Sequence, residues 1–212
     1  MALTLHLLRH GVHGHPAEVL AGRMAGVSLG YEGKQQAARL AHRFPPHSLD
    51  ALVTSPLQRC RETAAYIEEA CGLTATVDPD AAEVDFGEWT GQRFSALEAD
   101  PRWRNWNLHR DEAQAPGGEP MERVRSRVLA MLDGMRTLHS AGRVAVVTHA
   151  EIVRTAVLHI LGLPLQAYDR LEVAPASITT LCLWPGGGRL LGLNDVSSHH
   201  PALVPAREAL AV

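Results

Sequence analysis

The sequence predicts an α/β protein built as a three-layer α/β/α sandwich around a mostly parallel, mixed sheet. Four short apolar or β-branched runs bounded by turn signals are typical of buried strands: residues 3–8, 51–54, 144–148 and 178–184. Helical patterns lie between most of these runs, and strands that alternate with helices indicate a sheet with covered faces. The 212 residues suit a single domain, residues 1–212, which can bury a full core without disulfides.

The expected helices follow from apolar residues that recur at helical spacing. Four stretches have this spacing: residues 37–44, 57–71, 121–138 and 152–161. The last stretch is followed by Gly162 and Pro164, a usual helix-ending pair. Near the end, residues 178–184, a Pro-Gly-Gly-Gly turn and residues 189–194 predict a hairpin, so the last strands should run antiparallel at one edge of the sheet.

Two segments depart from this alternation. Residues 93–120 are irregular and too long for a plain connection, so we interpret them as a lid-like insertion near the site. Their aromatic and basic side chains could shape the leaving-group side of a pocket, although tryptophans at this spacing more often pack a lid onto the core. These side chains are Arg102, Trp103, Arg104 and Trp106. Residues 197–212 are expected to form a loosely held tail.

Composition restricts the partners. A formal charge of −3 and a pI near 6.4 give no general attraction for nucleic acid or for an anionic membrane. Three scattered cysteines fit neither a disulfide framework nor a CxxC metal site, which favours a reducing, cytoplasmic location. His6 and Arg9 interrupt the apolar N-terminal stretch, so neither a signal peptide nor a membrane span is expected. The sequence leaves a homodimer open.

Two histidines come directly after predicted strands. The first strand leads into Arg9-His10-Gly11, and residues 144–148 lead into His149. Ligands of open α/β sheets bind beyond the carboxyl ends of the strands, so the two imidazoles could converge there. A histidine in that position can attack phosphorus, although a lone one is more often a structural hydrogen-bonding group.

An arginine and a glutamate are further candidates. Ser55 and Pro56 resemble the start of a helix in which Ser55 caps and Arg59 lies in the first turn. Free backbone donors at a helix start favour an anion, and a guanidinium adds a bidentate clamp. Spacing alone would equally allow a surface ion pair between Arg59 and Glu62. Glu83 precedes an aromatic-glycine turn and by itself would be a solvated acid.

Together these segments resemble the histidine phosphatase superfamily, also called phosphoglycerate mutase-like, from Leu5 to about Asn194. The matching motifs occur in the order Arg9-His10-Gly11, Gly22-Arg23, Gly33 with Gln36-Ala37, Ser55-Pro56-Leu57 with Arg59 and Thr63-Ala64, Glu83 to Gly91, Pro116-Gly117-Gly118-Glu119 and Val147-Thr148-His149. The stretch from Glu83 to Trp89 is similar to that of α-ribazole phosphatases and broad-specificity phosphatases.

The resemblance implies a phosphomonoesterase that acts on a small phosphorylated metabolite, either α-ribazole 5′-phosphate or a broad range of monoesters. His10 would accept the phosphoryl group, and Glu83 would protonate the leaving oxygen. The phosphate oxygens would be held by Arg9, Arg59 and His149. Fixed positive donors can stabilise the transferred group, so no metal and no cofactor is expected.

Four further positions are secondary candidates: Gly11, His13, Arg23 and Ala150. Many members have a small hydroxyl residue where this chain has His13, which would either replace a phosphate donor or be merely exposed. Ala150 stands where glycine is common. Glu151 adds a negative charge near the pocket, and we expect it to point outward and favour the helix start.

Other chemistries are less consistent with the sequence. A cysteine-dependent phosphatase needs an arginine six residues after its nucleophile, and none of the three cysteines has one. Asp78-Pro79-Asp80 could serve an Mg²⁺-dependent aspartate phosphatase but more plausibly forms a turn. A metal site at the N-terminal histidines is disfavoured because His6 and His10 share a strand face while His13 and His15 lie in a loop. A cofactor-dependent phosphoglycerate mutase and a non-catalytic phosphate-ligand binding module stay open, and the short insertion favours a phosphatase over a mutase.

Overall fold

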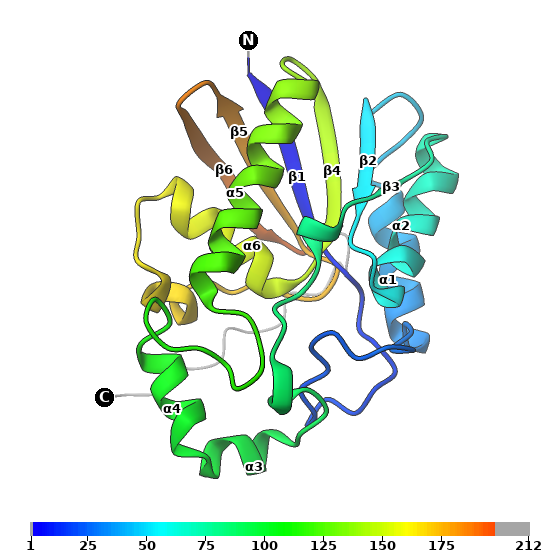
Figure 1. The fold of residues 1–212 in the computed structure, drawn as a ribbon. Coiled ribbons are helices and arrows are strands. Elements are labelled where there is room, and N and C mark those ends of the chain that lie inside the picture. The colour runs from blue at the N-terminus through cyan, green and yellow to red at the C-terminus, as the bar shows by residue number, and fades with distance from the viewer. Residues whose placement is uncertain (1, 198–212) are drawn as a thin grey trace.

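The computed structural model describes residues 2–197 and contains a six-stranded mixed sheet covered by helices on both faces (Figure 1). The strand order is β3-β2-β4-β1-β5-β6. The strands are β1 (Leu3–Arg9), β2 (Ala51–Thr54), β3 (Thr76–Val77), β4 (Arg143–Thr148), β5 (Ile178–Trp184) and β6 (Gly187–Asp195). The first four strands are mutually parallel, and β5 and β6 form the predicted antiparallel hairpin.

Six α-helices accompany the sheet: α1 (Tyr31–Ala41), α2 (Gln58–Cys71), α3 (Phe94–Ala99), α4 (Pro101–Leu108), α5 (Met121–Leu138) and α6 (Ala150–Ile160). Helices α1 and α2 lie on one face of the sheet and α5 and α6 on the other (Figure 1). The predicted fold class, an α/β protein with a mixed sheet, is therefore confirmed. No helix among residues 2–197 is long and apolar enough to cross a membrane.

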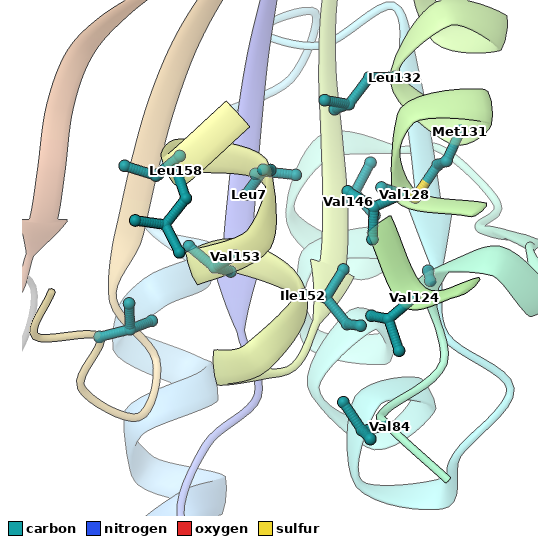
Figure 2. Close-up of a cluster of buried hydrophobic side chains, with 14 of the residues drawn as sticks. Leu7, Val84, Val124, Val128, Met131, Leu132, Val146, Ile152, Val153 and Leu158 are labelled. Atoms are coloured by element: carbon teal, nitrogen blue, oxygen red, sulfur yellow. The ribbon is translucent and has the colours of Figure 1, made fainter. Parts of the chain in front are cut away.

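Neighbouring residues of a strand point to opposite faces of the sheet, so each central strand supplies apolar side chains to the cores on both faces. In β1, Leu7 packs into the core beneath α5 and α6, whereas Leu8 belongs to the core beneath α1 and α2. In β4, Val146 and Val147 divide in the same way. Figure 2 shows Leu7 and Val146 among the apolar side chains of α5 and α6. Burial on both faces fixes the register of these central strands.

This arrangement brings the ends of β1, β2 and β4 to one edge of the sheet, because the three strands are parallel. In Figure 1 this is the lower edge, and α3 and α4 lie beyond it. His10 follows β1, and His149 follows β4. The fold therefore places both predicted histidines at the same edge.

Several predicted boundaries were wrong in detail. Helix α1 ends at Ala41, so Phe44 lies beyond it, although its side chain is buried in the same core. The N-cap residue of α2 is Leu57 and not Ser55, whose hydroxyl accepts from the backbone N–H of Leu57 at 3.3 Å and also contacts His149.

The segment 93–120 is less irregular than expected, since it contains α3 and α4. Asp100 caps α4 through the backbone N–H of Arg102, and Pro101 occupies the first turn, a start signal that the prediction missed. Trp106 is buried and packs edge-on against Trp89, which attaches α4 to the core. Of the predicted tail 197–212, all but residue 197 lies outside the described residues.

Candidate active site

A cavity of about 660 Å³, here called the edge cavity, opens at the carboxyl edge of the sheet. Four of the five predicted catalytic and phosphate-binding residues line it: Arg9, His10, Arg59 and Glu83. His149 is fully buried beside it, with its ring centroid 5.2 Å from that of His10. The predicted catalytic and phosphate-binding side chains are thus gathered in one place.

His10 is held as a neutral imidazole with a defined tautomer. Its Nδ1 lies 2.7 Å from the carbonyl oxygen of Gly11, which can only accept, so Nδ1 carries the proton. Burial, reinforced by the charges of Arg59 and Arg9, holds the pKa of His10 well below its ordinary 6.5. Nε2 therefore keeps its lone pair, which the Nε–H of Arg59 meets at 3.1 Å. An unprotonated imidazole nitrogen of this kind is chemically able to act as a nucleophile.

Arg59 connects the two imidazoles from the first turn of α2. One terminal nitrogen, Nη2, donates to the Gly22 carbonyl at 2.8 Å and to Nδ1 of His149 at 3.1 Å. The other, Nη1, is buried and has no hydrogen-bond partner in the described part of the chain. A buried charged donor without a partner is costly, and an anion oxygen would satisfy it. The alternative of a surface pair with Glu62 is wrong, because the Arg59 side chain is buried.

His149 is neutral for the same reason as His10. Burial, together with His10 and Arg59, holds the pKa of His149 well below 6.5. With Nδ1 accepting from Arg59, Nε2 carries the proton and donates to the Ser55 hydroxyl at 2.8 Å. Because the hydroxyl can also donate, the imidazole can exchange tautomers and present Nδ1–H to an anion. Ser55 was predicted as a cap, and its contact with His149 had no local signal.

Arg9 reaches the edge cavity from the end of β1. Its Nη1 donates to the carbonyl oxygen of Val173 at 2.6 Å, which fixes the guanidinium, and its Nε is buried without a described partner. Burial lowers the pKa of Arg9, opposed mainly by the charge of Glu83. Arg9 and Arg59 both line the cavity, and each has one buried N–H donor without a partner in the described part of the chain.

Glu83 faces the two histidines from the loop between the 3₁₀ turns Pro79–Ala81 and Gly87–Trp89. Its Oε1 accepts from the backbone N–H of Val84 at 2.9 Å, and its Oε2 lies 4.0 Å from Nδ1 of His149. Burial raises the pKa of Glu83, and the charge of Glu151 raises it further, while Arg59 opposes the shift. A carboxyl with a raised pKa next to a nucleophile is suited to donate a proton.

A charged network outside the cavity fixes the backbone that carries Glu83. Arg23 donates from Nε to the Glu83 carbonyl at 2.7 Å, and Arg127 donates to the same oxygen at 3.2 Å. Both guanidiniums also donate to Oε1 of Glu119 at 2.8 Å. Arg23 was a secondary candidate for the pocket, but its side chain is used in this network and does not line the edge cavity.

The other secondary candidates lie close to His10. A Cβ on Gly11 would meet the Gly33 carbonyl oxygen at 2.5 Å, so this position needs a glycine. His13 lines the cavity with its ring centroid 5.9 Å from that of His10, and burial lowers its pKa. Its Nδ1 is 3.2 Å from the His15 carbonyl, so the neutral ring offers an acceptor and not a donor. Ala150 lines the cavity as the first residue of α6.

The expectation that Glu151 points outward was wrong. Its side chain is largely buried in the cavity lining, where it accepts from Arg110 and, at 2.8 Å, from Arg154. These two arginines hold the pKa of Glu151 below its ordinary value, although burial opposes them. The spacing of Glu151 and Arg154 on one helix was a usable signal. Arg110 comes from the distant segment after α4 and had none.

The remaining predicted alternatives are placed elsewhere. Asp78 accepts from the backbone N–H of Asp80 at 2.9 Å and does not line the edge cavity, as expected for a turn. Arg102 and Arg104 are exposed away from the cavity, whereas Trp103 and Trp106 contribute to its wall. Within residues 2–197, no three side chains of His, Cys, Asp or Glu are grouped so that they could hold a metal ion.

Two imidazoles joined by a guanidinium at this edge of the sheet are what the resemblance to histidine phosphatases implies. The profile of the histidine phosphatase superfamily (branch 1) matches residues 5–196. The chain belongs to this superfamily.

Individual proteins agree with this assignment. An Escherichia coli protein described as "Probable phosphoglycerate mutase GpmB" is 30% identical over 214 residues, which cover 98% of this chain and 99% of the relative. The structure of a mycobacterial glucosyl-3-phosphoglycerate phosphatase is 25% identical with a TM-score of 0.81, over 92% of this chain and 99% of that one. The α-ribazole phosphatase of Shigella flexneri, 21% identical with a TM-score of 0.79 over 90% and 96% of the two chains, shows the same fold.

Proposed function

We propose that this protein is a phosphomonoester hydrolase that works through a phosphohistidine on His10. The observation that carries the proposal is the buried, neutral imidazole whose Nε2 faces the guanidinium of Arg59. An unprotonated nitrogen next to a fixed cation can attack a phosphate that the cation holds. The substrate would be a small phosphorylated metabolite, with α-ribazole 5′-phosphate or a broad range of monoesters as candidates.

Besides the substrate and water, the two steps of the proposed reaction use only side chains of the site. Nε2 of His10 forms a bond to phosphorus as the bond to the leaving oxygen breaks, and the proton of Glu83 passes to that oxygen. Glu83, now a carboxylate, takes a proton from the water that attacks phosphorus and releases His10. Arg9, Arg59 and His149 would hold the equatorial oxygens, where two guanidiniums supply the positive charge that a metal supplies elsewhere.

Rapid-quench labelling with a ³²P-labelled monoester tests the proposal. We expect acid-labile, alkali-stable label on the wild type and none on His10→Gln. The matched control is His6→Gln, because His6 lies on β1, the strand that leads to His10, but its Nδ1 contacts Thr180 and it does not line the cavity. Tight binding of the monoester without label would support the alternative of a non-catalytic binding module, and labelled His10→Gln would contradict the mechanism.

A second candidate is a cofactor-dependent phosphoglycerate mutase. It is favoured by the relatives described as phosphoglycerate mutases, one of which is 30% identical over nearly its whole length. Incubation with 3-phosphoglycerate and a trace of the bisphosphate separates the candidates, because a mutase forms 2-phosphoglycerate and a phosphatase forms glycerate and inorganic phosphate.

A further inference from the structure

The lining of the edge cavity includes three charged side chains that the proposed reaction does not use: Arg110, Glu151 and Arg154, here called the Glu151 cluster. Glu151 lies between the two guanidiniums. Its Oε2 accepts from Nη1 of Arg110, and its Oε1 accepts from Nη1 of Arg154 at 2.8 Å. Both carboxylate oxygens are therefore used inside the protein.

The side chain of Arg110 is buried, packed against two rings and hydrogen-bonded through both terminal nitrogens. Its side chain is 4% exposed, and its guanidinium carbon lies 3.2 Å from the ring centroid of Tyr168 and 4.1 Å from that of Trp106. The second terminal nitrogen donates to Oδ1 of Asn107 at 3.2 Å. Arg110 thus packs against two rings and has both terminal nitrogens paired, and only its buried Nε has no partner in the described part of the chain, which limits its use as a bidentate clamp for a substrate carboxylate.

Arg154 is engaged in a similar way. Its Nε donates to the carbonyl oxygen of Leu171 at 3.0 Å, while Nη1 is paired with Glu151. A carboxylate on the substrate would have to compete with Glu151 for this guanidinium. Each arginine of the cluster therefore has one terminal nitrogen committed to Glu151 and unavailable to a substrate carboxylate.

The charges of the whole cavity lead to the same conclusion. Its lining contains the guanidiniums of Arg9, Arg59 and the two arginines of the cluster. Against these four cations stand the carboxylates of Glu98 and Glu151, with Glu83 carrying the proton that the proposed reaction assigns to it. The excess of two positive charges matches one phosphate dianion. A second anionic group on the substrate would have no unmatched cation.

We propose that Glu151 determines the substrate class by restricting the enzyme to phosphate monoesters of uncharged alcohols and disfavouring leaving groups that carry a carboxylate. This inference rests on the proposed hydrolase function. The carboxylate of Glu151 repels an anionic leaving group and occupies the arginines that would otherwise bind it. Phe94, Trp103 and Tyr168 also line the cavity and offer apolar surface to the carbon skeleton of a sugar-like alcohol.

The test uses 3-phosphoglycerate and the glycerol monophosphate of matching configuration, which differ only in a carboxylate against a hydroxymethyl group. Wild-type kcat/KM should be at least about tenfold higher for the glycerol ester, because like charges at close range cost this much or more. In Glu151→Gln the ratio should fall by about tenfold, through a lower KM for 3-phosphoglycerate. Equal or reversed preference in the wild type would overturn the inference even if the variant does not fold.

Glu98→Gln is the matched control, because it removes one carboxylate from the same lining at an exposed position. The ratio of kcat/KM for the two esters should shift clearly less in Glu98→Gln than in Glu151→Gln. An equal shift would mean that the net charge of the cavity, and not the paired cluster, sets this ratio. A folded Glu151→Gln protein with an unchanged ratio would also refute the inference. Absence of turnover and of phosphohistidine with both esters would instead refute the hydrolase function, and the inference with it.

Discussion

Acidification should destabilise this protein through the two histidines at the centre of its site. Burial holds the pKa of His10 and His149 well below 6.5 in the folded protein, whereas both imidazoles regain their ordinary pKa in the unfolded chain. Between those two values the unfolded state binds more protons than the folded state. The free energy of unfolding therefore falls as the pH falls through 6.5.

The size of the effect follows from the number of protons. Each histidine that stays neutral in the folded state contributes a loss of about 1 kcal/mol between pH 6.5 and 5.5, so the pair contributes about 2 kcal/mol. Burial lowers the pKa of His6 and His13 as well, which adds to the loss. Glu83 acts in the opposite sense, because a raised carboxyl pKa makes the folded state bind the extra proton.

Urea unfolding at pH 7.5, 6.5 and 5.5 measures these losses. His10→Asn and His149→Asn should each reduce the loss between pH 6.5 and 5.5 by about 1 kcal/mol, whatever they do to stability at pH 7.5. The control His42→Asn replaces an exposed histidine and should retain the wild-type pH dependence. If His10→Asn lost as much stability on acidification as the wild type, His10 would not be a buried neutral imidazole, and the nucleophile would lose its physical basis.

Three further predictions concern the acid and the wall of the cavity. Glu83→Gln should slow the hydrolysis of alkyl phosphates by about 10²–10⁴ and that of 4-nitrophenyl phosphate far less, because only a poor leaving group needs the proton. The variant should also lack the fall in kcat/KM that the wild type shows above the raised pKa of Glu83. Equal losses on both esters would exclude the acid role. Arg127→Gln breaks the hydrogen bonds to the carbonyl oxygens of Asp80, Ala82 and Glu83, which fix the backbone that carries Glu83. The kcat for alkyl phosphates should therefore fall, with little change in KM or in the turnover of 4-nitrophenyl phosphate. Trp106→Ala should lower the free energy of unfolding by about 3–5 kcal/mol in urea titrations, since the ring is buried.

The fold was predictable because its strongest signals are local. The run that became β4 is apolar at four consecutive positions, as a strand buried on both faces must be, and the run that became β1 has leucines at positions 3, 5, 7 and 8. The Pro-Gly turn after Trp184 specifies the hairpin. His10, Arg59 and His149 were predictable for a related reason. Each follows directly after a strand or begins a helix, so topology alone brings them to one edge of the sheet.

The parts that were missed depend on contacts between distant segments. The spacing that suggested Ser55 as a cap is real, but a buried imidazole 94 positions away competes for the hydroxyl. Glu151 at the start of a helix would face solvent if Arg110, 41 positions earlier, were not packed beside it. Hydrogen bonds of this kind follow from side-chain packing after the chain has folded, and no pattern within one element encodes them.

The site obtains two opposite protonation states from one physical cause. Burial disfavours any charged form, so it lowers the pKa of His10 and raises the pKa of Glu83, which favours the states that the proposed attack and acid catalysis require. An arriving phosphate dianion would by itself favour protonation of both groups and would inactivate the nucleophile. The guanidinium of Arg59 is 3.1 Å from Nε2 of His10, so it offsets the dianion where the lone pair must stay free. At Glu83 the arginines lower the pKa, but burial and the charge of Glu151 outweigh them, so the same guanidiniums that keep the His10 lone pair free leave the pKa of Glu83 raised.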